Sequence, residues 1–325
     1  MKQKSAHKSS KIALFLGIFF LFNSALSRLY LEKKLSDSRT GFIDKEFQQY
    51  EKKIEVLAMG DSHPATGFDP RVFKNAFNFA LYGEKYIYNY YKLKYILERN
   101  PQIKVIILPI DLHSFSTWQF NRFLHDFYWV KYVDYLELGW YKKDLLRFIG
   151  KYIGGKIFPY LGEYEILFDM PLRDSKILKV PQPEIFQGFI RRTARFDKKR
   201  EQKARARALL HFQRQRYFDE LEALYFEKIL DLCALFNKNL VLVKYPVSQV
   251  YFRCASEKVP VKKLYGRVGE IIKPYRNVRV LDYQRLFFEN DGPYFADPDH
   301  LNQHGADRLS RRIREDLLRL NIISE

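Results

Sequence analysis

Four short apolar segments constrain the fold of this chain more than any other feature of its sequence. Each has four to six residues, a length that fits a strand buried on both faces better than a helix. Helix-like stretches separate them, including one around residues 86–99 and one that ends at residues 232–236. Strands that alternate with helices predict a mostly parallel sheet with helices on both faces. The four segments are residues 54–59, 105–108, 239–243 and 278–281.

Three loops next to the predicted strands and the last helix are rich in polar side chains. They comprise residues 60–64, 109–113 and 296–304. In a parallel sheet the carboxyl ends of the strands meet at one edge, and ligands bind there. We therefore expect the functional site at this edge.

The N-terminus has the pattern of a targeting or anchoring segment. Four lysines precede an apolar run at residues 12–26. As a helix, this run would span roughly 22 Å, less than the ~30 Å of the hydrocarbon layer. It is therefore either a cleaved signal segment or a short anchor, which residues 29–31 would lengthen. Four basic residues follow the run, so the balance of Lys and Arg does not set its orientation.

These features predict four parts along the chain. We expect a basic cytoplasmic tail at residues 1–11 and a membrane anchor or signal segment at 12–31. A linker at 32–53 then leads to the α/β domain at 54–325. A helical insertion occupies residues 114–217 of that domain, because this interval is too long for a simple crossover between two strands.

The first part of the insertion is unusually aromatic. Residues 115–168 contain all three tryptophans, Trp118, Trp129 and Trp140, at a constant spacing of eleven. Eleven residues make about three helical turns, so the three rings could share one face of a helix. Such a face could form the core of a helical subdomain, or a surface for sugar stacking, membrane contact or a protein partner.

The second part of the insertion is strongly basic. Residues 191–216 carry eleven Lys and Arg against two acidic residues, which is half of the net charge of +18 of the whole chain. The segment Arg191–Arg216 is either a solvated helix face or a contact for an anionic membrane surface or polymer. A nucleic-acid partner is not expected, because no zinc-finger, RNP or helix-turn-helix pattern occurs.

Composition excludes several classes of protein. Hydrophobic residues make up 47% of the chain, which excludes a disordered or collagen-like protein, and the charged fraction of 29% excludes one with many membrane spans. Only Cys233 and Cys254 are present, so neither a disulfide scaffold nor a cysteine-rich zinc site can form. Whether these two cysteines pair stays open.

Two polar segments at the predicted sheet edge have the residues of a nucleophilic site. In the first, Ser62 follows a strand in the turn Gly-Asp-Ser-His, where its hydroxyl can reach a substrate. In the second, Asp297 and His300 stand three residues apart just before a helical stretch. The carboxylate of Asp297 can orient the imidazole of His300, which can then deprotonate Ser62. The pattern predicts a Ser-His-Asp triad.

With these two motifs the sequence resembles the SGNH/GDSL hydrolase superfamily over residues 54–113 and 238–318. The resemblance implies a flavodoxin-like three-layer α/β/α fold, with Ser62 as the nucleophile and Asp297 and His300 in the terminal Asp-x-x-His block. The stretch from Asn78 to Gly83 is similar to the second block, so the backbone amides of Ser62 and Gly83 would bind the oxyanion. No cofactor and no metal are expected.

The third block departs from the family pattern. Where the family has an asparagine, the chain reads Pro-Ile-Asp-Leu-His at residues 109–113. The carboxylate of Asp111 cannot donate a hydrogen bond as an asparagine amide does, so one oxyanion donor is missing. The remaining polar residues nearby are expected to support the site or to bind substrate, namely Asp61, His63, Asn78, Asp111 and His113.

The chain has a closer resemblance to membrane-anchored SGNH-like proteins of the bacterial cell envelope, those of alginate O-acetylation and of D-alanyl transfer to teichoic acid. This resemblance implies a single N-terminal anchor in the cytoplasmic membrane and an extracytoplasmic, periplasmic catalytic domain. It also implies transfer of an acyl group to a polysaccharide, together with a membrane-bound O-acyltransferase. Hydrolysis and transfer share the acyl-enzyme step, and the sequence does not separate them.

Two other functions remain open at the level of sequence. A metal-dependent phosphoesterase would use Asp61, His63, Asp111, His113, Asp297 and His300, which could converge at the strand ends. A glycan-binding or scaffold protein with an inactive site would account for the missing asparagine and the many aromatic residues.

Overall fold

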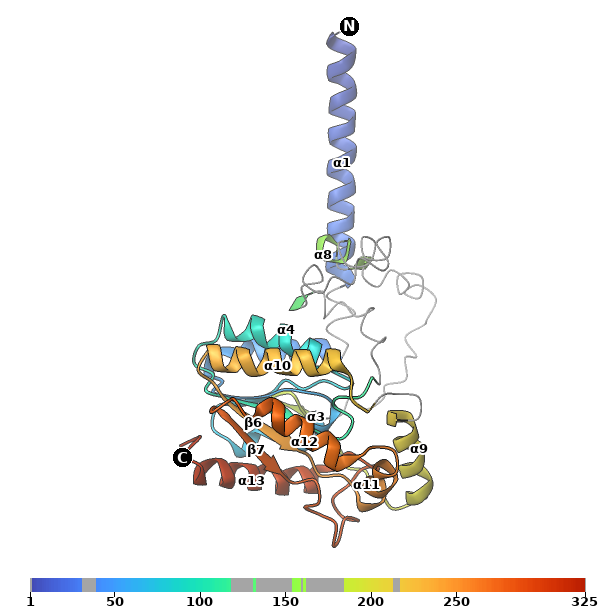
Figure 1. Cartoon of the computed structure of the whole chain (residues 1–325). Coiled ribbons are helices and arrows are strands. Elements are labelled where there is room, and N and C mark those ends of the chain that lie inside the picture. The colour runs from blue at the N-terminus through green and yellow to red at the C-terminus, as the bar shows by residue number, and fades with distance from the viewer. Residues whose placement is uncertain are drawn as a thin grey trace. The chain divides into compact units, whose positions relative to one another are not determined.

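The computed structural model describes residues 2–30, 39–117, 131–132, 154–158, 160–161, 184–212 and 217–324 (Figure 1). The chain forms two compact units. One comprises residues 1–42 and 122–179, and the other residues 43–121 and 180–325. Trp118, Trp129 and Trp140 lie outside the described residues, as do residues 31–38 and 213–216.

A five-stranded parallel sheet forms the centre of the second unit, in the order β2-β1-β3-β6-β7. All four predicted strands are present. Strand β2 was not predicted, because Asn75 and Asn78 leave only two consecutive apolar residues in its segment. The strands are β1 (Val56–Ala58), β2 (Ala76–Asn78), β3 (Val105–Pro109), β6 (Asn239–Lys244) and β7 (Val278–Asp282).

Helices cover both faces of this sheet, which confirms the predicted α/β class (Figure 1). Helices α4 (Tyr86–Leu97) and α10 (Glu220–Leu235) lie on one face, and α13 (Gln303–Arg319) lies on the other. The remaining helices of this unit connect strands or flank the sheet. They are α3 (Ser62–Gly67), η3 (Pro70–Val72), α9 (Arg200–Phe212), α11 (Gln249–Ser256) and α12 (Val261–Ile272).

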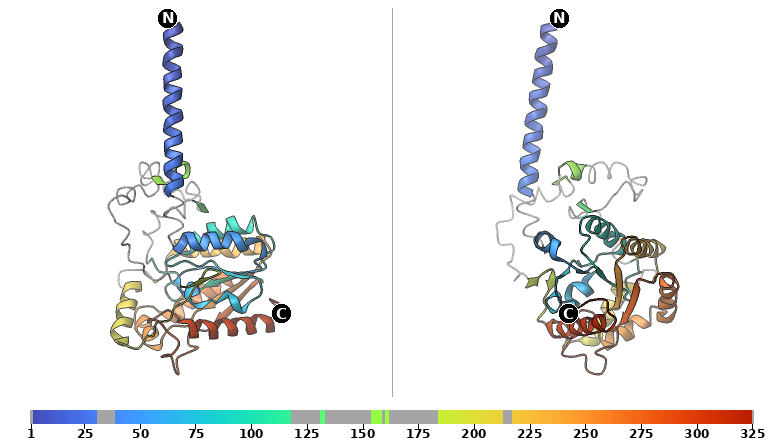
Figure 2. Two further views of the ribbon diagram at one scale, coloured as in Figure 1. Left: turned by 180° about the vertical axis from the view of Figure 1, so that it is seen from behind. Right: turned by 90° about the vertical axis from the view of Figure 1, so that its left-hand side faces the viewer.

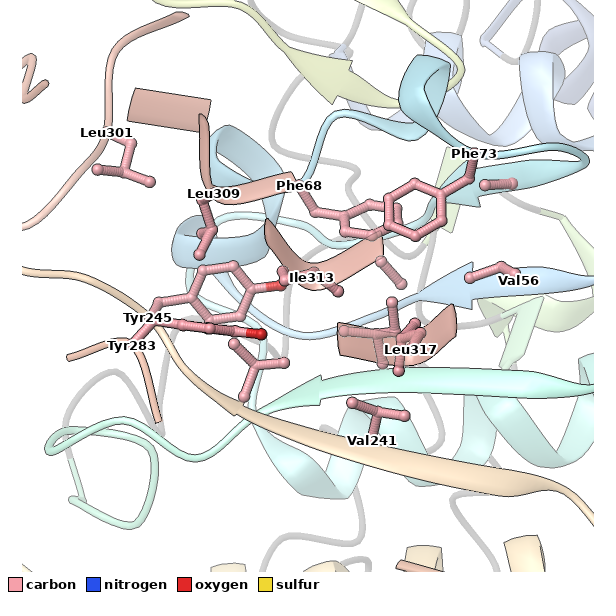
Figure 3. Close-up of a cluster of buried hydrophobic side chains, with 14 of the residues drawn as sticks. Val56, Phe68, Phe73, Val241, Tyr245, Tyr283, Leu301, Leu309, Ile313 and Leu317 are labelled. Carbon is pink, nitrogen blue, oxygen red and sulfur yellow. The ribbon is translucent and has the colours of Figure 1, made fainter. Parts of the chain in front are cut away.

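Helix α13 packs on the sheet through one apolar stripe. Leu309, Ile313 and Leu317 are fully buried and recur every fourth residue, so they lie on one side of the helix. They contact a core that includes Val56 and Val241 (Figure 3). Burial of each such side chain contributes about 1.5–3 kcal/mol. This packing fixes the start of α13, and with it the loop that carries His300.

Residues 39–53, within the stretch expected as a linker, form helix α2 (Arg39–Tyr50) and the short η2 (Glu51–Lys53). From residue 43 onward they belong to the sheet unit, and α2 lies on the same face as α4 (Figure 2). Ile43 and Phe47, four residues apart, are buried, and the ring of Phe47 stacks on Phe79 at 4.5 Å.

Part of the expected helical insertion is a β-hairpin, formed by β4 (Ile185–Phe186) and β5 (Phe189–Ile190). Its turn contacts β2 and α2 closely. The carbonyl of Gln187 accepts a hydrogen bond from the amide of Asn78, and the carboxylate of Glu46 accepts from the amides of Gln187 and Gly188. Gly188 has a φ of +80°, and a Cβ there would lie 1.8 Å from the carbonyl of Asn78. Only glycine fits this approach.

The first unit contains helix α1 (Lys2–Tyr30) and the single turn α8 (Gly154–Ile157). Within α1, residues Ser10–Tyr30 are long and apolar enough to cross a membrane, with a mean hydropathy of 1.8. A signal sequence has the same properties, so the structure is consistent with both forms predicted for this segment.

Candidate active site

Ser62 is the first residue of α3, directly after the turn that ends β1. The turn requires Gly60, which has a φ of +124°, and a Cβ at this position would lie 2.4 Å from the ring of Pro109. The side chain of Asp61 caps α3 by accepting a hydrogen bond from the amide of His63 at 2.9 Å. Ser62 itself is half-buried. The turn therefore presents its hydroxyl at the carboxyl end of β1.

The second motif lies in the loop between β7 and α13. The carboxylate of Asp297 accepts hydrogen bonds from the amides of Asp299 and His300. The carbonyl of Pro298 accepts from both the amide and the hydroxyl of Ser248, the N-cap of α11. These contacts make the loop a rigid turn.

The two motifs meet across the sheet edge, although 238 residues separate them in the chain. His300 Nε2 lies 2.8 Å from the hydroxyl oxygen of Ser62. On the other side of the ring, His300 Nδ1 lies 2.8 and 3.0 Å from the two carboxylate oxygens of Asp297. With Nδ1–H donating to Asp297, Nε2 can accept the proton of Ser62. The three side chains thus form a continuous Ser-His-Asp arrangement.

The charge of Asp297 is stabilised from both sides. Burial would raise the pKa of this carboxyl, but the facing His300 and the guanidinium of Arg192 hold it below the usual value. Arg192 Nη1 lies 2.5 Å from Asp297 Oδ2. Asp297 is therefore ionised at neutral pH, which lets it orient the imidazole.

The loop after β2 borders the triad. The ring of Tyr82 is 44% exposed and lies nearly parallel to the imidazole of His300, with centroids 6.0 Å apart. Gly83 follows with a φ of +76°. The side-chain amide of Asn78 donates to the carbonyls of Pro64 and Phe68, at 2.7 and 2.8 Å. Asn78 therefore supports the loops around Ser62, and its amide is engaged by backbone.

The remaining sequence-predicted residues form two buried His-Asp pairs behind Ser62. His63 Nδ1 lies 2.7 Å from Asp111 Oδ2, and His113 Nε2 lies 2.8 Å from Asp61 Oδ2. The other oxygen of Asp111 accepts from the amide of Tyr245 at 2.7 Å. Asp111, at the position of the missing asparagine, is thus used to hold His63.

Charge pairing within this cluster opposes the effect of burial. Burial lowers the pKa of His63, but Asp111 and Asp299 together raise it well above the usual value. For Asp61, burial acts to raise the pKa, and His113 and His63 bring it below the normal range. For Asp111, burial prevails and the pKa is raised. His63 is therefore an imidazolium at neutral pH.

Several residues that surround the triad were not predicted from the sequence. Asp299 lies beside His300, and Arg192, Arg207 and His211 come from the basic segment 191–216. The net charge of this segment predicted either a solvated helix face or a contact for an anionic surface or polymer. Nothing in the sequence shows that two of its arginines contact carboxylates of the site itself.

Two sets of donor atoms have spacings that could hold a divalent cation. One set comes from Asp61, His63 and His113, and the other from His63, Asp299 and His300. Within each set the atoms lie within 4.8 Å of one another. His63, His113 and His300 each contact a carboxylate at 2.7–2.8 Å, and these pairs account for their positions.

No family model and no curated protein matches the chain. A solved structure from Streptococcus pneumonia, described as "a putative platelet activating factor", is similar to it with a TM-score of 0.41 and 14% identity. The match covers 90% of this chain and 99% of that chain. The strand order and register given above establish the parallel α/β fold of this chain directly.

Proposed function

We propose that this chain is an SGNH-type serine esterase or acyltransferase in which Ser62 is the nucleophile, His300 the general base and Asp297 the orienting carboxylate. The observation that carries the proposal is the continuous path from the Ser62 hydroxyl through both nitrogens of His300 to Asp297. Such a path is the requirement for activating a serine hydroxyl, which is otherwise a weak nucleophile.

In the first half-reaction, the oxygen of Ser62 attacks the acyl carbonyl while its proton passes to His300 Nε2. The backbone amides of Ser62 and Gly83 stabilise the tetrahedral oxyanion. Collapse of this intermediate breaks the ester bond, and the leaving alcohol takes the proton from His300. Ser62 then carries the acyl group.

In the second half-reaction, His300 takes a proton from the acceptor, whose oxygen attacks the acyl-enzyme. The Ser62–acyl bond breaks, and the proton returns to the Ser62 oxygen. With water as the acceptor the product is a free acid, and with a sugar hydroxyl it is an acylated glycan. Asp111 donates nothing to the oxyanion in this scheme, because its carboxylate binds His63 and the amide of Tyr245.

The substrate that we propose is an O-acyl group, such as acetyl, on an exported or cell-envelope polysaccharide. Three features support it: the apolar span in α1, the exposed ring of Tyr82 beside His300, and the resemblance to membrane-anchored envelope proteins. In this proposal α1 anchors the catalytic domain on the extracytoplasmic side, where a membrane-bound O-acyltransferase acts with it. Exposed cations of segment 191–216 contact an anionic membrane surface or polymer.

The test measures acetyl release and transfer by the purified full-length chain in detergent. With p-nitrophenyl acetate as donor, we expect Ser62→Ala to lower turnover at least about 10⁴-fold, whereas Ser256→Ala, an exposed serine of α11, leaves it unchanged. A fluorophosphonate should label Ser62. Acetylated sugar among the products with oligosaccharide acceptors would identify a transferase. Full turnover by Ser62→Ala would refute the triad.

The clustered donor atoms also favour a test of metal-dependent phosphoester hydrolysis. That activity would be lost in EDTA and restored by a divalent cation, whereas a serine enzyme resists the chelator. A scaffold or glycan-binding role would instead let cells tolerate Ser62→Ala with no change in polysaccharide acylation.

A further inference from the structure

Asp299 is a fully buried carboxylate that the scheme above does not use. Its side chain is 1% exposed, and its oxygens lie 3.3 Å from Arg207 Nε, 3.5 Å from His300 Nδ1 and 3.6 Å from His63 Nε2. His211 Nε2 is 3.9 Å away. A buried carboxylate is stable only when cations or donors surround it, and here they come from three separate parts of the chain.

Arg207 connects Asp299 with the carboxylate of the triad. Its Nε faces Asp299 Oδ1 at 3.3 Å, and its Nη2 lies 3.9 Å from Asp297 Oδ2. The planar fork of a guanidinium suits two neighbouring carboxylates better than the point charge of a lysine does. One side chain thus contacts both carboxylates that face Nδ1 of His300.

Helix α9 is held against the domain in a way that fixes Arg207. Its small residues Ala204 and Ala208 are buried, and His211 Nδ1 lies 2.6 Å from the hydroxyl of Tyr251 in α11. Helix α11 in turn binds the carbonyl of Pro298 through its N-cap, Ser248. Helices α9 and α11 therefore contact the loop of Asp297 and Asp299 from two directions.

The two faces of α9 differ in their surroundings. Arg207 and His211, four residues apart, point toward Asp299, and the Arg207 side chain is 28% exposed. Arg205 is 60% exposed and pairs with Glu201 one turn earlier on the helix. The helix thus supplies a matched comparison between a site-facing arginine and a solvent-facing one.

We propose that Asp299 and Arg207 form a positioning pair for His300, so that α9 of the basic segment is part of the catalytic apparatus. Asp299 places a second negative charge beside Nδ1, where it stabilises the imidazolium that forms when His300 takes the proton of Ser62. Arg207 keeps both carboxylates in place and ionised. This inference rests on the proposed function, and it assigns to the basic segment a role in the reaction step.

The experiment compares Arg207→Gln, Arg207→Lys and the control Arg205→Gln in the full-length chain in detergent, with p-nitrophenyl acetate. We expect Arg207→Gln to lower kcat about 10–100-fold, a typical effect of losing a group that orients a functional side chain, with KM within about twofold of wild type. Arg207→Lys should recover part of kcat. Arg205→Gln should match wild type, because p-nitrophenyl acetate carries no polyanion for Arg205 to bind. Equal kcat values for Arg207→Gln and Arg205→Gln would overturn the proposal.

A spectroscopic measurement separates failure of this inference from failure of the proposed function. The Nδ1 proton of His300 should give a strongly downfield ¹H NMR signal, assigned by its loss in His300→Gln. We expect Arg207→Gln and the isosteric Asp299→Asn to shift this signal, whereas Arg205→Gln and Ser62→Ala retain it. If Ser62→Ala keeps wild-type turnover, the proposed function is wrong, but the Nδ1 proton signal of His300 still tests the Asp299–Arg207 pair. If the signal is unchanged in both Arg207→Gln and Asp299→Asn, the proposed positioning pair is refuted. If Arg207→Gln does not fold, Asp299→Asn alone provides this test.

Discussion

Two groups of buried charges lie near the carboxyl edge of the sheet, and they are built differently. The site cluster consists of three His-Asp pairs and the additional carboxylate of Asp299, that is, of Asp61, His63, Asp111, His113, Asp297, Asp299 and His300. The lysine cluster, next to α4, consists of Glu84, Lys85, Lys92 and Glu222. In the site cluster, side chains bind mainly other side chains, whereas the lysine cluster mainly binds backbone.

The contacts of the lysine cluster show this difference. Lys92 Nζ donates to both oxygens of Glu84, at 2.6 and 2.7 Å, and to the carbonyl of Phe79 at 2.7 Å. It therefore joins the two ends of the loop that carries Gly83. Lys85 donates to the carbonyl of Ser116 at 2.5 Å. Lysine and glutamate thus hold loops in place, while imidazoles, which can accept and donate protons in catalysis, lie next to the nucleophile.

Asp297→Asn tests the site cluster and should have the largest effect. An asparagine favours the wrong tautomer of His300, so we expect kcat to fall about 10⁴-fold with little change in the free energy of unfolding. Steady-state kinetics and urea unfolding measure the two quantities. Asp307→Asn, an exposed carboxylate of α13, is the control. A large loss of stability with intact kcat in Asp297→Asn would reverse the roles assigned to the two clusters.

Lys92→Met tests the lysine cluster. It leaves Glu84 buried without its cation, and breaking such a pair destabilises a protein by about 3–5 kcal/mol. Urea unfolding should show this loss, and the double variant Lys92→Met, Glu84→Leu should recover much of it. Unchanged stability in the single variant would mean that the pair does not hold the loop.

Asn78→Ala sharpens the comparison with a neutral group that also binds backbone. It leaves the carbonyls of Pro64 and Phe68 without their donor, so we expect a loss of about 1–3 kcal/mol in unfolding free energy. Asn290→Ala, which replaces an exposed asparagine, is the control and should be nearly neutral. Equal losses in both variants would contradict the role of Asn78.

The smallest expected effect is a difference in pH dependence between two neighbouring histidines. Burial lowers the pKa of His63, but Asp111 and Asp299 raise it overall, so the folded chain retains a proton that the unfolded chain loses above pH ~6.5. The stability that His63 contributes is therefore full below this pH and declines above it. For His211, burial lowers the pKa, so its folded form loses stability as the pH falls below the same value.

Urea unfolding between about pH 5.5 and 8.5 measures how the free energy of unfolding changes with pH and checks the sign of both slopes. Each slope is at most about 1.4 kcal/mol per pH unit for each proton. His63→Asn should flatten the decline on the alkaline side, and His211→Asn should flatten the decline on the acid side. The exposed His304→Asn should change neither. The same dependence of unfolding free energy on pH in all three variants would show that His63 and His211 do not cause these declines.

Much of the fold was predictable because it depends on local pattern. The segments around β1, β3, β6 and β7 are continuous apolar runs, and Ser62, Asp297 and His300 stand in recognisable spacings. Strand β2 lies between Asn75 and Phe79 without a continuous apolar run, and it becomes a strand through pairing with β1. The role of Arg207 depends on how α9 packs against α11, which no spacing in the sequence records. Long-range packing, not residue type, limited the prediction of the site.

The 238-residue separation between Ser62 and His300 has a consequence for the newly made chain. Ser62, shortly after β1, is synthesised early, whereas His300, its proposed base, arrives only with the loop before α13. Under the proposed mechanism, a polypeptide still emerging from the ribosome, or one truncated before Asp297, carries a Ser62 hydroxyl without its base. Under the proposed mechanism, Ser62 gains its base only when α13 packs on the sheet, so this packing step completes the site.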